Sequence, residues 1–222
     1  MNDVVFNSVR ALEPVLIHYL VVVFISMINE TLGLHIDAAS LTSMAAVLVL
    51  PLFLYKMKKD ETVRAVKMKS RMKPWMYLGI PVFAIICNQL LTVLVNLLVF
   101  TINKVFSTEL SNAVQEGLFS SNFVVQLIGI GILVPVMEEV LFRGLVYNRF
   151  KDYNKEWLSA LMGAAVFAVY HGNLLQILFA FPMALIITEV YRRGRTLMAP
   201  ILFHVTVNVS SIVITYFNQT VG

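Results

Sequence analysis

The chain has 222 residues, of which 59% are hydrophobic and 14% are charged, and it carries a formal net charge of +4. Its mean hydropathy of +0.79 lies far from that of a soluble domain, so the sequence predicts an integral membrane protein with no nucleic-acid partner. The single cysteine, Cys87, excludes an intrachain disulfide and a metal site built on paired cysteines. Because the chain begins with polar and acidic residues, we expect no cleavable signal peptide.

Seven apolar segments follow one another along the chain, each close to the roughly 20 residues that a membrane-spanning helix needs. They predict an all-α fold, a polytopic membrane helical bundle of about seven transmembrane helices. Only the tripeptide 171–173 separates the fifth segment from the sixth, and it is either a tight turn or a break inside the membrane. The segments are 12–29, 38–55, 75–101, 123–147, 156–172, 174–191 and 197–217.

Basic residues gather in alternate connections between these segments. The segment 56–73 contains eight lysines and arginines against two acidic residues, and the segments 148–156 and 191–195 are also basic. The intervening connections 29–38 and 103–122 are poor in basic residues. Because positively charged connections stay in the cytoplasm, we predict an N-in, C-out topology. We expect the segment 56–73 to act as a topology determinant, with contact to anionic lipid headgroups as the alternative.

The N-terminal part, residues 1–122, contributes the first three segments and the basic cytoplasmic connection 56–73. Few polar residues interrupt its first two apolar segments. His18 lies in the first of them, and we expect a buried histidine with a hydrogen-bond partner, not a catalytic group. The chemistry is therefore expected in residues 123–222, within one integrated membrane domain.

Two adjacent glutamates, Glu138 and Glu139, interrupt an apolar run that should enter the bilayer. A carboxylate there costs several kcal/mol unless it is paired, neutralised or used. Arg143 lies four residues after Glu139, on the same helical face, so we expect these two to form an ion pair. Glu138 points about 100° away and is free to face another helix.

Further polar groups follow on two later segments. His171 ends the fifth segment, preceded by Phe167, while His204 and Asn208 share one face of the seventh. A carboxylate in an apolar pocket is a competent general base for water, and an asparagine amide is a good oxyanion donor. The set therefore predicts a hydrolytic site. The same groups suit a zinc ion, and one intramembrane histidine or asparagine alone would be interhelical hydrogen bonding.

Three motifs carry a family resemblance: Glu138-Glu139-x-x-x-Arg143, Phe167-x-x-x-His171 and His204-x-x-x-Asn208. In this order, on separate apolar segments, they resemble the signature of the CPBP family. These are the CAAX-protease and bacteriocin-processing membrane proteins, also called Abi proteins. The resemblance covers roughly residues 123–217 and makes residues 123–222 the expected catalytic core.

The resemblance implies an intramembrane glutamate-type endopeptidase. Glu138 would activate the water, assisted by His171, while His204 and Asn208 would stabilise the oxyanion. Glu139, Arg143 and Phe167 would support the site. No cofactor is expected. A zinc-dependent variant, with Glu138, His171 and His204 as ligands, is the minority alternative.

Other classes of intramembrane protease lack their motifs in this sequence. There is no His-Glu-x-x-His, as a site-2-type zinc protease would have, and no Gly-x-Ser-x-Gly. The four aspartates fall in connecting or terminal regions, so no intramembrane aspartate pair is expected; they are Asp3, Asp37, Asp60 and Asp152.

The expected depth of His171 in the membrane differs from that of Glu138 and His204. Glu138 and His204 lie near the cytoplasmic ends of their segments, whereas His171 falls about 14 residues, or roughly 21 Å, into its own. Either the stretch 148–157 forms an interfacial helix or the helices tilt strongly.

We therefore expect a multi-pass endopeptidase of a bacterial plasma membrane. Its partners would be membrane lipids and a small membrane-associated peptide, or the tail of a protein, as substrate. It would serve peptide maturation, bacteriocin immunity or signal-peptide processing. A non-catalytic immunity or scaffold protein that binds a peptide or protein is the alternative from another class. A proton-coupled transporter is disfavoured because no internal repeat is visible.

Overall fold

The computed structural model describes residues 3–61, 63, 70–106 and 121–221. Parts of the two connections used for the topology prediction, residues 62, 64–69 and 107–120, lie outside the described residues. Helices alone make up the regular structure of the described ranges, which confirms the all-α prediction. The helices are α1 (Asp3–Thr31), α2 (Ala38–Lys59), α4 (Met76–Phe106), α6 (Phe123–Val125), η1 (Gln126–Leu133), α7 (Val134–Glu139), η2 (Val140–Tyr147), α8 (Asn148–Tyr153), α9 (Glu156–Tyr170), α10 (Leu174–Gly194) and α11 (Met198–Val221).

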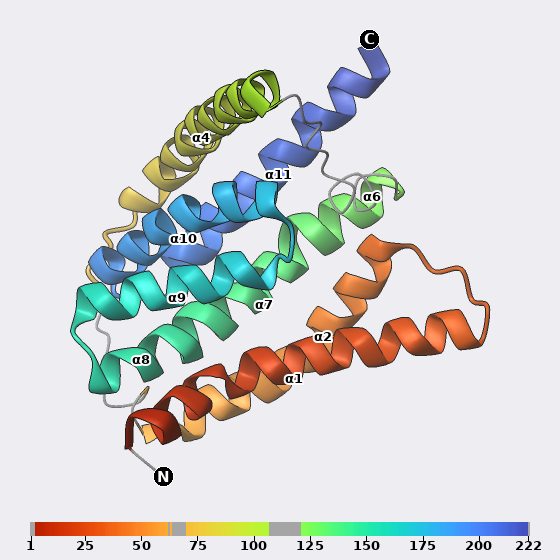
Figure 1. Cartoon of the computed structure of the whole chain (residues 1–222). Helices are drawn as coiled ribbons and strands as arrows, with labels where there is room; N and C mark the ends of the chain where they lie inside the picture. The colour runs from red at the N-terminus through yellow and green to blue at the C-terminus, as the bar shows by residue number, and fades with distance from the viewer. Residues whose placement is uncertain (1–2, 62, 64–69, 107–120, 222) are drawn as a thin grey trace.

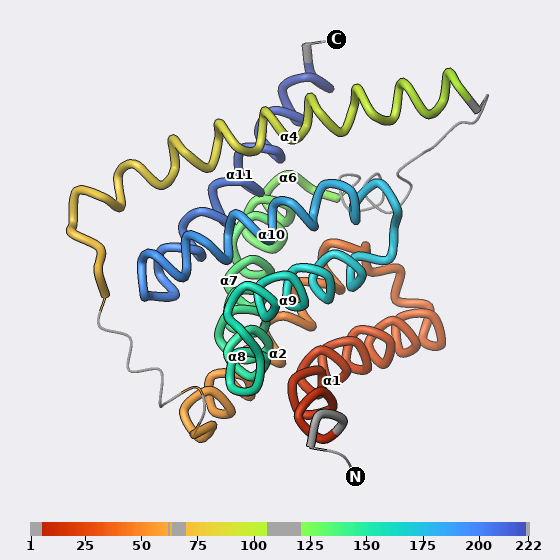
Figure 2. The backbone as a smooth tube through the Cα atoms, turned by 60° about the vertical axis from the view of Figure 1, so that its left-hand side comes forward, coloured from red at the N-terminus to blue at the C-terminus, as the bar shows by residue number. Residues whose placement is uncertain are grey.

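The helices form three groups across the bundle (Figures 1 and 2). Helices α1 and α2 pack together on one flank, and α4 and α11 pack on the other. The continuous helical run of residues 123–153, from α6 to α8, lies between them with α9 and α10. The two termini lie at opposite ends of the bundle (Figure 1). The orientation of these ends in the membrane stays a prediction.

Six helices among the described residues are long and apolar enough to cross a membrane, which confirms the polytopic membrane fold; α9, with 15 residues, is shorter. Their environments differ. Only 17% of the most apolar stretch of α1, and of α4, is buried, so these helices turn most of their apolar surface outward. For residues 123–153 the share is 56%. The helix with the two glutamates is therefore the one enclosed by the others.

The fourth helix is longer than predicted. It does not end at 147 but continues through α8 to Tyr153. The polar residues that suggested a loop are buried and partnered there. Asn148 donates hydrogen bonds to the Arg143 carbonyl (2.9 Å) and the Tyr191 hydroxyl (2.8 Å), and Arg149 pairs with Asp60.

This extension removes the mismatch in depth. Glu138 lies fifteen residues before Tyr153, and His171 lies fifteen residues after Glu156, on the antiparallel α9. Both are therefore roughly 20 Å along their helices from the turn at 154–155. Neither an interfacial helix at 148–157 nor a strong tilt is needed to bring them to one level.

The tripeptide 171–173 is the tight turn and not a break in a spanning helix. His171 ends α9, Gly172 takes a left-handed conformation (φ +69°), and Asn173 caps α10 by accepting a hydrogen bond from the Leu175 amide at 2.9 Å. Glycine takes this conformation without steric cost. The turn returns the chain so that α9 and α10 pack against each other.

Two π-helical segments, η1 and η2, flank the short α-helix α7 that bears the glutamates. Such segments are rare and are frequently found at functional sites. Glycines bring this run close to its neighbours. A Cβ atom at Gly129 would lie 2.0 Å from the Ser43 hydroxyl oxygen, and one at Gly144 would lie 2.9 Å from the Met57 sulfur. Small residues at helix interfaces allow such close approach in membranes.

Candidate active site

The predicted ion pair between Glu139 and Arg143 is confirmed, and it lies in the centre of the bundle. Arg143 Nη1 donates to Glu139 Oε1 at 2.7 Å, and the two side chains are 2% and 0% exposed. Arg143 Nη2 donates to the Ala184 carbonyl at 3.0 Å, on α10. The guanidinium also lies over the Phe167 ring, 4.9 Å from its centroid. The pair therefore ties the central helix to α9 and α10.

His204 of α11 bridges the two glutamates. Its Nδ1 is 2.8 Å from Glu139 Oε1, and its Nε2 is 3.6 Å from Glu138 Oε2. Because a carboxylate paired with arginine only accepts hydrogen bonds, Nδ1 carries a proton and donates it to Glu139. This arrangement fixes the imidazole ring and turns Nε2 toward Glu138. It also confirms that Glu138 faces another helix.

The two glutamates are bonded very differently. One oxygen of Glu139 accepts from both Arg143 and His204, while Glu139 Oε2 is buried without a partner among the described residues. Glu138 is 7% exposed, and within the described residues its carboxylate has one close polar neighbour, His204 Nε2 at 3.6 Å. Glu139 is thus held in place, and Glu138 is left able to act on a small molecule such as water.

His171 sits at the end of α9, beside this group. Its Nδ1 bonds to the Phe167 carbonyl at 2.8 Å. A carbonyl can only accept, so Nδ1 is protonated and Nε2 of the neutral ring holds a lone pair. The Phe167 ring contacts both histidines, with its centroid 4.8 Å from that of His171 and 5.9 Å from that of His204. Phe167 therefore packs against both imidazole rings.

Asn208 lies one turn after His204 but has a different partner. Its Nδ2 donates to the Ile130 carbonyl at 2.9 Å, in η1. Close packing supports this contact, since a Cβ atom at Gly131 would lie 3.1 Å from a methyl carbon of Val209. The structure thus joins Asn208 to the π-helical backbone, and no hydrogen bond links it to either glutamate within the described ranges.

Sequence reasoning missed an aromatic extension of the site. The Tyr170 hydroxyl bonds to His18 Nδ1 at 2.6 Å, and the two rings stack with centroids 5.5 Å apart. His18 is 2% exposed, which confirms the buried, partnered histidine expected on the first helix. Tyr170 also contacts the Phe142 ring at 5.9 Å. Its place next to His171 in the sequence was the only available signal.

A second charged cluster was also missed, at the end of the bundle where α8 meets α1 and α2. Asp60 accepts from Arg10 (2.7 Å) and Arg149 (2.8 Å), and Glu13 accepts from Lys56 (2.5 Å) and Arg149 (3.2 Å). The partners in these four pairs are 43 to 136 positions apart in the chain. Sequence spacing gives no signal for such pairs.

The described residues do not gather three histidine, cysteine, aspartate or glutamate side chains in a metal-binding arrangement. Of the three ligands considered for zinc, Glu138 and His204 approach each other at 3.6 Å, and the His171 ring contacts the same Phe167 ring as His204. Metal dependence is therefore a question for experiment.

Comparison with known proteins confirms the family resemblance. Residues 120–210 match the family model described as Type II CAAX prenyl endopeptidase Rce1-like. This range contains all three motifs and the whole of the cluster around Glu139.

Several curated proteins are similar to this chain over 77 to 98 residues. A Lactococcus lactis protein named UPF0177 protein YaiH is 33% identical over 98 residues, covering 44% of this chain and 40% of the relative. A second L. lactis protein, named UPF0177 protein in abiGi 5'region, is 36% identical over 81 residues, covering 36% and 34%. The Bacillus subtilis protein named "Putative membrane peptidase YdiL" is 23% identical over 77 residues, covering 35% and 32%. The matches thus span about a third to two fifths of these relatives. No solved structure matches the chain.

Proposed function

We propose that this chain, whose residues 120–210 match the Rce1-like CAAX prenyl endopeptidase family, is a membrane-embedded endopeptidase that uses Glu138 to activate water. The observation that carries the proposal is the contrast within the acidic pair. Glu139 is held by Arg143 and His204, whereas Glu138 keeps its carboxylate available in an enclosed site. A general base must have a free lone pair within reach of the proton that it removes.

In the proposed reaction a water molecule lies beside Glu138 Oε2. Glu138 removes a proton from it as the water oxygen attacks the carbonyl carbon of the peptide bond. The tetrahedral intermediate then collapses, the C–N bond breaks, and the proton passes from Glu138 to the leaving amine nitrogen. Each step keeps the proton within the site, so no further reactant is required.

The neighbouring groups would lower the barrier by stabilising charge. Fixed hydrogen-bond donors aimed at a developing oxyanion contribute several kcal/mol, about 3–4 for one donor. His204 Nε2 points toward Glu138, which places a donor beside the reacting atoms once this nitrogen is protonated. The second amide hydrogen of Asn208 would donate to the oxyanion, while its first remains with Ile130. His171, with its Nε2 lone pair, would assist the water.

Substrates would be small membrane-associated peptides or the tails of proteins. The enclosed position of the site, on a helix more than half buried, favours a segment that enters the bundle from the membrane over a folded soluble protein. The setting we propose is the plasma membrane of a bacterium, in peptide maturation, bacteriocin immunity or signal-peptide processing. Nothing in the site demands a prenyl group.

The test is cleavage of a fluorogenic library of lipid-associated peptides by the purified chain in liposomes. Glu138→Gln should lower the rate by roughly 10²–10⁴, the range for loss of a general base. Glu30→Gln is the matched control, because Glu30 is exposed at the end of α1. Activity that survives in Glu138→Gln would refute the assigned role.

Repeating the cleavage assay with a metal chelator distinguishes water activation by the carboxylate alone from water activation by a bound metal. Cleavage by the wild-type chain that is insensitive to chelator supports water activated by the carboxylate alone. Loss on chelation, with recovery on adding zinc, assigns the site to the metal-dependent alternative. If Glu138→Gln also keeps its cellular phenotype, the scaffold function replaces the enzyme.

A further inference from the structure

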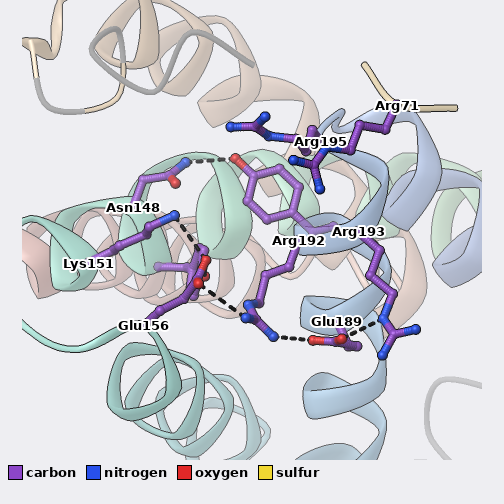
Figure 3. A pocket seen from close by; sticks show the side chains of 10 residues that line it. Arg71, Asn148, Lys151, Glu156, Glu189, Arg192, Arg193 and Arg195 are labelled. Atoms are coloured by element: carbon purple, nitrogen blue, oxygen red, sulfur yellow. Dashed lines mark hydrogen bonds and ion pairs between the residues drawn. The ribbon is translucent and has the colours of Figure 1, made fainter. Parts of the chain in front are cut away.

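A polar pocket, whose lining includes neither Glu138 nor Glu139, lies near the end of the bundle (Figure 3). It has a volume of about 360 Å³ and opens between α8, the start of α9 and the end of α10. Five cationic side chains line it, against two carboxylates, Glu156 and Glu189, so the lining carries a net positive charge. The cations are Arg71, Lys151, Arg192, Arg193 and Arg195.

Three of these cations are already paired with the two carboxylates. Arg192 pairs with both carboxylates, Lys151 pairs with Glu156 at 3.0 Å, and Arg193 pairs with Glu189 at 2.6 Å. Figure 3 shows these pairs as a chain of contacts across one side of the pocket. They account for both carboxylates and leave two arginines.

Arg71 and Arg195 are the remaining pair. Within the described part of the chain, no hydrogen bond or ion pair engages either guanidinium, and Figure 3 shows both on the side opposite Glu156. Both flank Gly194. The Arg71 amide donates to the Gly194 carbonyl at 3.0 Å, and Arg195 follows Gly194 directly. The fold thus brings two like charges, 124 positions apart, into the lining of one pocket, and no carboxylate of the described residues pairs with either.

The backbone at Arg195 is also unusual. Arg195 ends α10 in the left-handed conformation, with φ of 51°. Glycine normally takes this position, and a side chain there costs roughly 1 kcal/mol. Here a glycine precedes the position, and arginine occupies it. Strain of this kind is retained where the side chain has a use.

Two tryptophans mark the level of this pocket in the membrane. The chain has two, Trp75 and Trp157, and they are 67% and 61% exposed. Trp157 follows Glu156 of the pocket, and Trp75 lies four residues after Arg71. Exposed tryptophan is enriched at the boundary between lipid tails and water. The pocket therefore lies at the depth of lipid headgroups.

We propose that this pocket binds the phosphate of an acidic phospholipid headgroup between Arg71 and Arg195. The guanidinium fork matches phosphate oxygens with two parallel hydrogen bonds, which favours a phosphate over a diffuse negative surface. Basic pockets between the ends of membrane helices bind acidic headgroups in this way. The exposed Leu78, in the first turn of α4 and three residues after Trp75, offers apolar surface for the lipid's acyl chains.

Lipid retention in native mass spectrometry tests the proposal without any peptidase assay. The full chain is released from vesicles of phosphatidylcholine mixed with phosphatidylglycerol, and the lipid kept by each variant is identified. The wild type should keep phosphatidylglycerol in preference. The double variant Arg71→Ala with Arg195→Gly should lose this preference by roughly tenfold to thirtyfold, the effect of removing two interfacial cations.

The variants are chosen so that misfolding and diffuse charge give different results. Glycine suits the left-handed position of residue 195, so the fold should be kept, and thermal unfolding in phosphatidylcholine alone checks this. The matched control is Lys58→Ala with Lys59→Ala, which removes two exposed cations from the same end of the bundle. Equal loss in both double variants would overturn the pocket in favour of a diffuse basic surface.

A further arm separates a lipid from a free anion. Inorganic phosphate is added to the lipid-free chain in detergent, and thermal stabilisation is compared with that given by phosphatidylglycerol. Stabilisation by the lipid alone supports the proposal. Equal stabilisation by inorganic phosphate, abolished by the same double variant, would overturn the lipid in favour of a soluble phosphate ligand.

Discussion

Two clusters of charged side chains include residues of the central helix. They differ in how many of their carboxylate oxygens accept a hydrogen bond or ion pair. In the cluster around Arg149, at the end of the bundle, all four carboxylate oxygens of Asp60 and Glu13 accept from a cation. In the cluster around Arg143, one oxygen of Glu139 accepts twice, and no described residue donates a hydrogen bond to its other oxygen or to Glu138, which His204 approaches at 3.6 Å. A saturated cluster holds helices together. An unsaturated one, kept in a buried place, has capacity for chemistry.

The largest expected effect comes from breaking the saturated cluster. Arg149→Ala leaves Asp60 with one partner fewer in a buried place, and removing one member of a buried ion pair costs about 3–5 kcal/mol. We expect the free energy of unfolding in detergent to fall by that amount, while peptidase activity per folded molecule stays unchanged. Arg193→Ala is the control, because its side chain is 82% exposed and its pair should contribute at most about 1 kcal/mol.

If Arg149→Ala lowered activity without lowering stability, the division between a structural cluster and a chemical cluster would be wrong. Stability and specific activity should therefore be measured on the same preparation.

The next effect separates the two adjacent glutamates. Glu139→Gln removes the charge that balances the buried Arg143 but keeps an oxygen that accepts hydrogen bonds, so we expect a loss of about 3 kcal/mol in the free energy of unfolding, the lower end of the range for a broken buried ion pair. Activity should fall roughly 10- to 100-fold, because His204 loses the group that orients it. Glu138→Gln should change stability by less than about 1 kcal/mol, since it removes no close ion pair.

Thermal unfolding and cleavage rate, compared between these two isosteric variants, sharpen the comparison within one turn of helix. A large loss of stability in Glu138→Gln, with none in Glu139→Gln, would reverse their roles.

The smallest expected effect on stability concerns Asp37, an exposed carboxylate that accepts several hydrogen bonds. Asp37 caps α2, accepts from the Ser40 amide (3.0 Å) and hydroxyl (2.7 Å), and accepts from the Ser121 hydroxyl next to α6. The Ser121 hydrogen bond, followed by those from Ser40, lowers the pKa of Asp37 to about 2. The stabilisation is therefore present above the ordinary aspartate pKa of about 4 and is lost as the pH falls toward 2.

Because Asp37 is exposed, Asp37→Asn should cost no more than about 1 kcal/mol at neutral pH. The difference in melting temperature between variant and wild type should shrink between pH 4 and pH 2, the interval set by the lowered pKa. A difference that does not change with pH would show that the lost charge is not the cause.

Local patterns predicted much of this molecule. Hydropathy gave the helical membrane fold, and four-residue spacing gave the Glu139–Arg143 pair, because both depend on neighbours within one helix. The same reasoning placed Glu138 toward another helix. The residues 171–173 suit either a tight turn or a break inside the membrane, and the structure has the tight turn.

Contacts between distant segments could not be predicted in this way. Hydropathy ended the fourth helix at 147 because Asn148 and Arg149 are polar, and only their partners on α10 and α2 explain why the helix continues. The same holds for the bond from Asn208 to Ile130, which depends on how α11 meets a π-helical segment. Spacing alone places His204 and Asn208 on one face but does not choose their partners.

The two arms of the helical hairpin formed by residues 138–171 are equal in length, and this length fixes how far the candidate site lies from the turn at 154–155. Fifteen residues lead from Glu138 down to Tyr153, and fifteen lead from Glu156 back up to His171, so the covalent chain sets the distance of the site from one surface. A bilayer of different thickness would move the opposite surface and leave this distance unchanged. Inserting one residue in a single arm would shift its candidate site residue, Glu138 or His171, by about 1.5 Å and turn it by about 100°, whereas the same insertion in both arms would lower the candidate site as a unit.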